Sequence, residues 1–175
     1  MAMLEAAIFV VFPFCMAFAA VSDLLSMTIA NRVSLLLVVT FAIVAPLTGM
    51  EWSQYAWHFV AAAAVLFATF SLFAIGGMGG GDAKLMTATA LWMGFGIELL
   101  QYLVASAVIG GVLTLAILSY RGSPLAVVTS NNMFLKHFAD PKVGIPYAIA
   151  LGAAGLLVFP DTPLMIWALD RFAGN

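Results

Sequence analysis

The sequence predicts an all-α membrane protein with about six transmembrane helices. Of its 175 residues, 65% are hydrophobic and 8% are charged, whereas soluble domains average about 45–50% apolar and about 25% charged residues. Six apolar runs alternate with short polar connections, and a spanning helix needs about 20 mostly apolar residues. We therefore expect one transmembrane domain over residues 1–175 and no separate soluble domain.

The composition also argues against several classes of protein. The net charge is −2 and the six Lys and Arg residues are scattered singly, which argues against a nucleic-acid partner. The only cysteine, Cys15, excludes an internal disulfide and a paired-cysteine zinc site. The lone histidines His58 and His137 lack metal-ligand spacing, so we expect no metal and no cofactor. Glu5 stands where a signal peptide would carry bases, so the first run is expected to be a retained span.

The apolar runs and the turn formers between them set the expected helices in chain order. The runs lie at residues 4–21, 33–47, 55–75, 83–93, 98–120 and 143–159. The fourth run is short for a span, at about 1.5 Å per residue, so the glycine-rich stretch before it is expected to dip below the membrane surface. Residues 162–172 are expected to form an interfacial helix. Residues 121–142 form the longest connection. It is expected to be either a lid or substrate-docking element, with a short helix at 132–138, or a passive linker.

Basic residues predict the orientation, because Lys and Arg in short loops favour the cytoplasmic side. The loops after the first, third and fifth runs contain Arg32, Lys84, Arg121, Lys136 and Lys142. The other side has only Arg171, together with most of the acids. We therefore expect both termini outside and the connection 121–142 in the cytoplasm.

Two aspartates stand out beside this pattern. Asp82 follows five glycines in residues 76–81, and Asp82 and Asp23 are the acids that abut apolar runs on the cytoplasmic side. Unpaired burial of a carboxylate is costly, so each acid needs a partner or a function. If the first and fourth runs pack together, the carboxylates would share a proton and one pKa would rise. The ionised member could then take a proton from water while the protonated one polarises a peptide carbonyl.

Each acid also has a purely structural interpretation. Asp82 is well placed to act as the N-cap of the fourth run. Asp23 could simply end the first run in the headgroup layer. Their placement on one side of the membrane, together with the glycine-rich stretch, favours a functional pair.

The residues around Asp82 resemble a known motif. The run Gly79-Gly80-Gly81-Asp82 fits the pattern Gly-x-Gly-Asp and is followed by Ala-Lys-Leu, with Asp23 just after the first span. This arrangement resembles the type IV prepilin peptidase family, membrane aspartyl proteases of the Gly-x-Gly-Asp class. The length, with no large soluble insertion, looks most like the short form that serves Flp/Tad-type pilus systems.

The resemblance implies a set of site residues, with Asp23 and Asp82 as the catalytic pair. The residues implied to bind substrate or shape the loop are Gly79, Gly80, Gly81, Lys84, Asn31, Pro146 and Tyr147. Ala30 replaces a proline that the family has before the asparagine, which departs from the family's pattern in the first loop. Lys84 lies about 200° around a helix from Asp82, so we expect it to anchor at the membrane surface in preference to assisting catalysis.

The resemblance also implies an activity. It implies an endopeptidase of the bacterial inner membrane, with its active site facing the cytoplasm, that removes a short basic leader from prepilins and pseudopilins. Such substrates have an apolar helix after the leader, the residue before the cut would be glycine, and pilus-assembly machinery is an implied partner. Longer family members bind zinc through paired cysteines and methylate the new N-terminus; with one cysteine, we expect no methyltransferase activity here. Small residues such as Gly110 and Gly111 permit homo-oligomers.

Other functions stay open. The same aspartates could move protons or cations in a small membrane transporter, or act as caps in a structural subunit of a larger membrane complex. Among proteases, archaeal preflagellin peptidases and presenilin-like enzymes share the Gly-x-Gly-Asp pattern. Six short-looped spans fit the prepilin type better than the presenilin type.

Overall fold

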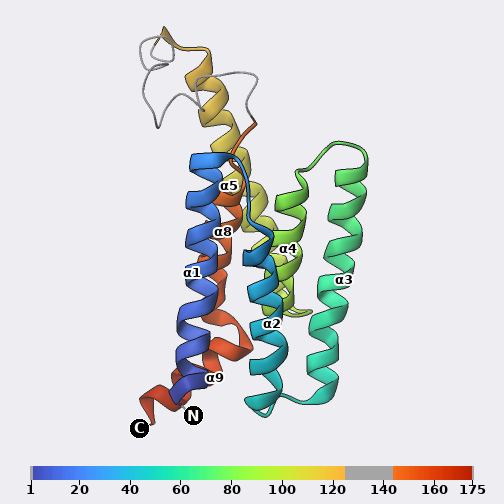
Figure 1. The fold of residues 1–175 in the computed structure, drawn as a ribbon, viewed down its shortest axis with the longest axis vertical. Coiled ribbons are helices and arrows are strands. Elements are labelled where there is room, and N and C mark those ends of the chain that lie inside the picture. The colour runs from blue at the N-terminus through green and yellow to red at the C-terminus, as the bar shows by residue number, and fades with distance from the viewer. Residues whose placement is uncertain (1, 125–143, 175) are drawn as a thin grey trace.

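The computed structural model describes residues 2–124 and 144–174, and every regular element within these ranges is a helix (Figure 1). The helices are α1 (Ala2–Ser26), α2 (Asn31–Leu47), α3 (Trp52–Ala74), α4 (Gly80–Met93), α5 (Ile97–Arg121), α8 (Ala148–Val158) and α9 (Pro163–Ala173), with a 3-10 turn at Phe159–Asp161. The all-α prediction is confirmed for the described ranges. The predicted short helix at residues 132–138 lies outside them.

From α1 to α5, consecutive helices run in opposite directions along the bundle, and α8 runs antiparallel to α5 and continues into α9 after a bend of 52° (Figure 1). α1, α3 and α5 end at one end of the bundle, where α4 and α8 begin, and the start of α1 lies beside α9 at the other end. We call the end at which α1, α3 and α5 finish the glycine-turn end, because it includes the turn between α3 and α4. Both chain ends therefore lie at the opposite end; that this end faces outside the cell stays a prediction.

The helix lengths support an all-α multi-pass membrane protein. Among the described residues, α1, α3 and α5 are long and apolar enough to cross a membrane, and α8 with α9 makes a fourth span if this pair, bent by 52°, counts as one. α2 has 17 residues and α4 has 14, both below the roughly 20 that a perpendicular span needs. The expectation of about six spans therefore stays a prediction.

α1 continues past its predicted end, so the expectation that Asp23 follows the first span is wrong. The Ser26 hydroxyl donates to the Ser22 carbonyl at 2.7 Å, and the Ser22 hydroxyl donates to the Thr28 carbonyl at 2.9 Å. These bonds satisfy carbonyls around the last turn, and the helix stops where Met27 adopts a left-handed φ of 53°. Asp23 consequently lies inside the helix, one turn from its end.

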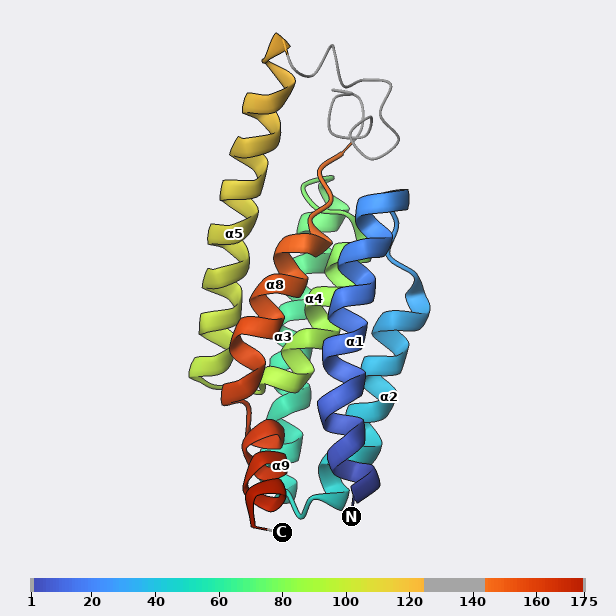
Figure 2. The same ribbon diagram turned by 90° about the vertical axis from the view of Figure 1, so that its left-hand side faces the viewer.

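α4 occupies the centre of the bundle, in contact with α2, α3, α5 and α8. Figure 2 shows it behind α8, with α1 and α5 to either side. The Trp92 indole donates to the Leu37 carbonyl at 3.0 Å, and its ring contacts those of Phe12 and Phe159. A helix surrounded in this way does not need to match the bilayer thickness, because other helices pack against its faces.

Glycines bring α1 and α8 together. A Cβ added at Gly152 of α8 would lie 2.9 Å from the Met16 carbonyl oxygen of α1, and one at Gly155 would lie 3.1 Å from the Met16 sulfur. Such close backbone approach is typical of small-residue helix contacts in membranes. Because the helices are antiparallel, this contact places the start of α8 beside the Asp23 end of α1.

Candidate active site

The aspartates predicted to form a pair line one cavity at the glycine-turn end. The cavity has a volume of about 280 Å³. Its lining comes from the end of α1, the loop after it and the glycine turn, and comprises Asp23, Met27, Thr28, Ile29, Gly79, Gly80, Gly81 and Asp82. The structure thus brings together both predicted catalytic residues and all three predicted loop glycines.

Asp23 is held by the first residue of α8. Its side chain is only 7% exposed, and its Oδ2 accepts a hydrogen bond from the Ala148 N–H at 3.0 Å. This N–H belongs to the first turn of α8, where backbone donors lack partners within the helix and the helix dipole favours negative charge. Asp23 therefore caps α8, and the interpretation that it merely ends α1 in the headgroup layer is wrong.

Asp82 lies in the first turn of α4, close to the glycine turn. The N-cap of α4 is Gly79, and no side chain makes a capping hydrogen bond there, so the interpretation of Asp82 as the N-cap is wrong. Burial raises the pKa of Asp82 to about 6, with a further contribution from the negative charge of Asp23. Asp82 thus retains its proton at a pH where an ordinary aspartate has lost it.

Each of the three loop glycines has a close contact that a side chain would disturb. A Cβ at Gly79 would lie 2.8 Å from Asp82 Oδ2, and one at Gly81 would lie 3.2 Å from Ile29 Cβ. A Cβ at Gly80 would lie 3.2 Å from the Phe73 ring. The glycines let the Asp82 carboxyl lie against the backbone of its own turn and let that turn pack against the loop after α1.

Lys84 and Asn31 contact each other beside the cavity without lining it. The Lys84 ammonium donates to Asn31 Oδ1 at 2.9 Å, and both side chains are exposed. The bond joins the first turns of α4 and α2. This arrangement fits an anchoring role for Lys84 better than direct contact with the carboxyls.

Pro146 and Tyr147 precede α8, so the last run becomes helical later than residue 143, where it was expected to begin. Pro146 is buried and Tyr147 is the N-cap residue. The Tyr147 hydroxyl donates to the Ser106 carbonyl of α5 at 3.1 Å. Burial raises the pKa of Tyr147, and the charge of Asp82 adds to the shift. Neither residue lines the cavity; they form the support behind the Ala148 N–H.

Several contributions to the site were not foreseen. Met27, Thr28 and Ile29 line the cavity. The sequence signal for Met27 and Thr28 is their position a few residues after Asp23, and Ile29 stands before Ala30 and Asn31, where the resemblance to the family continues. The Ala148 N–H could not be found by residue type, because every residue except proline has this group. Pro146 gives an indirect signal, since prolines are common near helix starts.

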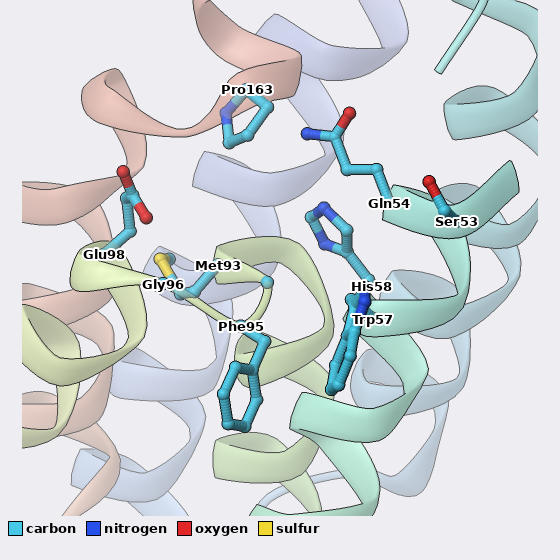
Figure 3. A pocket seen from close by; sticks show the side chains of 10 residues that line it. Ser53, Gln54, Trp57, His58, Met93, Phe95, Gly96, Glu98 and Pro163 are labelled. Carbon is cyan, nitrogen blue, oxygen red and sulfur yellow. The ribbon is translucent and has the colours of Figure 1, made fainter. Parts of the chain in front are cut away.

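A second cavity of about 320 Å³ lies away from the aspartates, where the start of α3 meets the turn between α4 and α5 and the start of α9 (Figure 3). His58 lines it and is 2% exposed, with Nδ1 hydrogen-bonded to the Leu91 carbonyl at 2.8 Å. A Cβ at Gly94 would lie 2.7 Å from the His58 ring. His58 is thus a packing residue, and this cavity shares no residue with the aspartate cavity.

A sequence model of the type IV leader peptidase family matches residues 10–115, which is more than half of the chain. The chain belongs to the type IV leader peptidase family. The match includes Asp23, the glycine turn and Asp82, and it ends before α8. No curated protein sequence and no solved structure matches the chain. The resemblance to prepilin peptidases drawn from the Gly-x-Gly-Asp motif is confirmed at the level of the family.

In this leader peptidase family member, Gly79→Ala is expected to lower peptidase activity by about 10–100-fold, the size of effect that small displacements of catalytic groups produce. The added methyl group would displace the Asp82 carboxyl, whose Oδ2 lies 2.8 Å from the Cβ position. The matched control is Gly77→Ala in the same turn, where the nearest atom beyond the adjoining residues lies at an ordinary 3.4 Å. Initial cleavage rates of both purified variants check this prediction, and equal rates would contradict it.

Proposed function

We propose that the chain is an aspartic endopeptidase that removes the short basic leader of Flp/Tad-like type IV prepilins and pseudopilins. The observation that carries the proposal is the shared cavity, in which Asp23 and Asp82 have different surroundings. Asp23 receives an N–H from a helix start, whereas Asp82 is half-buried, and burial together with the charge of Asp23 raises its pKa to about 6. Two carboxyls that differ in this way suit a division into base and acid.

The proposed mechanism uses one proton shared by the pair. Ionised Asp23 takes a proton from a water molecule, whose oxygen bonds to the scissile carbonyl carbon while protonated Asp82 donates a hydrogen bond to the carbonyl oxygen. The proton on Asp23 then passes to the amide nitrogen as the C–N bond breaks. The products are a free carboxyl group on the leader and a free amine on the mature protein, and Asp82 keeps its proton throughout.

The proposed substrate follows from the surroundings of the cavity. Gly79, Gly80 and Gly81 form part of its wall, and a substrate glycine before the cut would let two backbones approach closely. The apolar helix after the leader would lie in the bilayer beside the bundle. The excess of bases at the glycine-turn end supports a cytoplasmic location for the cavity, in the bacterial inner membrane.

The test is coexpression with an Flp-type prepilin, followed by gel mobility and intact mass of the product. We expect the leader to be removed after a glycine and the new N-terminus to lack a methyl group. A substrate with Val in place of that glycine should resist cleavage.

The alternative with physical support is a proton- or cation-coupled transporter, since a half-buried acid with a raised pKa, such as Asp82, also suits proton transfer. Proteoliposomes containing the wild-type chain separate the two functions. An intact prepilin together with ion flux that depends on Asp23 and Asp82 would overturn the peptidase proposal.

A further inference from the structure

Tyr147 lies in a notch on α5 that exists because residue 110 is glycine. A Cβ added at Gly110 would overlap the Tyr147 ring. Gly110 is buried, whereas the next residue, Gly111, is exposed and has nothing within 4 Å of its Cβ position. The two adjacent glycines therefore have different surroundings, and only the first accommodates another helix.

The same face of α5 also holds the other end of the tyrosine. Ser106, one turn before Gly110, accepts the hydrogen bond from the Tyr147 hydroxyl at 3.1 Å. Further along α5, the Arg121 guanidinium donates to the Gly144 carbonyl at 3.2 Å. α5 thus contacts the segment before α8 at two places about three helical turns apart.

This segment leads directly to the catalytic cavity. Tyr147 is covalently followed by Ala148, whose N–H donates to Asp23 Oδ2 in a buried hydrogen bond. A displaced Tyr147 ring would move the peptide unit that it shares with Ala148. Gly110 is therefore connected to Asp23 through a single side chain and a single peptide.

We propose that Gly110 is a positioning residue for peptide cleavage, because by seating Tyr147 it fixes the start of α8 and holds the Ala148 N–H against Asp23. The cleavage part of this inference rests on the proposed function. The structural part, a coupling between Gly110 and Asp23, does not.

The first experiment compares Gly110→Ala with Gly111→Ala in the full chain. Both changes replace glycine by alanine within one helix, so the gain in helix propensity is the same. We expect Gly110→Ala to lower kcat by about 10–100-fold while KM stays within about twofold, because the substrate contacts are unchanged and the base is misplaced. Gly111→Ala should behave as wild type. Wild-type kcat in Gly110→Ala would overturn the proposal.

A second variant identifies the route of the effect. Tyr147→Ala removes the ring that Gly110 accommodates, so Gly110→Ala should have no additional effect on kcat in that background. An equal loss in both backgrounds would show that Gly110 acts otherwise than through Tyr147, and would overturn the proposal.

The third experiment needs no substrate. A double-mutant cycle of Gly110→Ala with Asp23→Ala is read by thermal unfolding in detergent. We expect a non-additive change in the midpoint, whereas the cycle of Gly111→Ala with Asp23→Ala should be additive. If the wild-type chain cleaves no prepilin, the proposed function fails and this cycle still tests the connection. Additive changes in both cycles would overturn the connection itself.

Discussion

Asp23→Asn and Asp82→Asn are each expected to lower prepilin cleavage by about 10²–10⁴-fold, the usual contribution of a general acid or base. Asparagine has nearly the shape of aspartate, and at position 23 its amide oxygen can still accept the Ala148 N–H. It cannot, however, take a proton from water or share one with a second carboxyl. The measurement is the initial rate of leader removal by purified protein in detergent or nanodiscs.

These variants separate catalysis from capping. A residue whose only task is to cap a helix should tolerate asparagine, which is among the best N-cap residues. Asp161→Asn, at an exposed carboxyl between α8 and α9, is the matched control and should cleave normally. If either cavity variant retains wild-type activity and folds normally, the proposed pair is wrong.

Asp82→Asn is also expected to stabilise the folded protein above about pH 6, although it lowers activity strongly. Burial and the charge of Asp23 raise the pKa of Asp82 from 3.8 to about 6 in the folded state. The folded protein therefore binds this proton more tightly than the unfolded chain does. Its contribution to stability is present below pH 4 and is lost as the pH rises through about 6. Asparagine has no proton to lose, so the variant avoids this loss.

The midpoint of thermal unfolding, followed from pH 4 to pH 8 in one detergent, checks this prediction. The advantage of Asp82→Asn over wild type should appear between pH 4 and pH 6 and reach a few degrees at pH 8, since about 1 kcal/mol shifts the midpoint by about 2–4 °C for a chain of this size. Asp23→Asn removes the negative charge that contributes to the raised pKa of Asp82 but leaves the burial of Asp82 unchanged. This variant should therefore flatten the pH dependence of the unfolding midpoint only in part. A variant whose midpoint runs parallel to wild type across this range would contradict the assigned pKa.

The association of Asp23 with Asp82 could be predicted from the sequence because it depends on coarse properties. Apolar runs fix which connections lie on the same side, and the distribution of bases distinguishes the sides. Both signals sum over many residues, so an error of a few residues at a helix end does not affect them. The glycines before Asp82 were equally visible, since no other residue tolerates such close contacts.

The details around the carboxyls depended on local hydrogen bonds that apolar pattern does not encode. α1 continues through Asp23 because Ser22 and Ser26 use their hydroxyls on nearby carbonyls. The donor to Asp23 is a backbone group, and the notch at Gly110 becomes apparent only when Tyr147 is placed in it. Both α8 and its contact with Asp23 also lie beyond the region matched by the family model.

The hydrogen bond between Ala148 and Asp23 joins residues 125 positions apart, and this separation bears on how the protein is made. A chain is inserted into the membrane from its N-terminus, so α1 to α4 are available to pack long before α8 has been synthesised. Until α8 arrives, Asp23 lacks its donor. The protease is therefore expected to acquire its complete site only at the end of biogenesis. By then its own chain, which an earlier active site could cleave, is already folded.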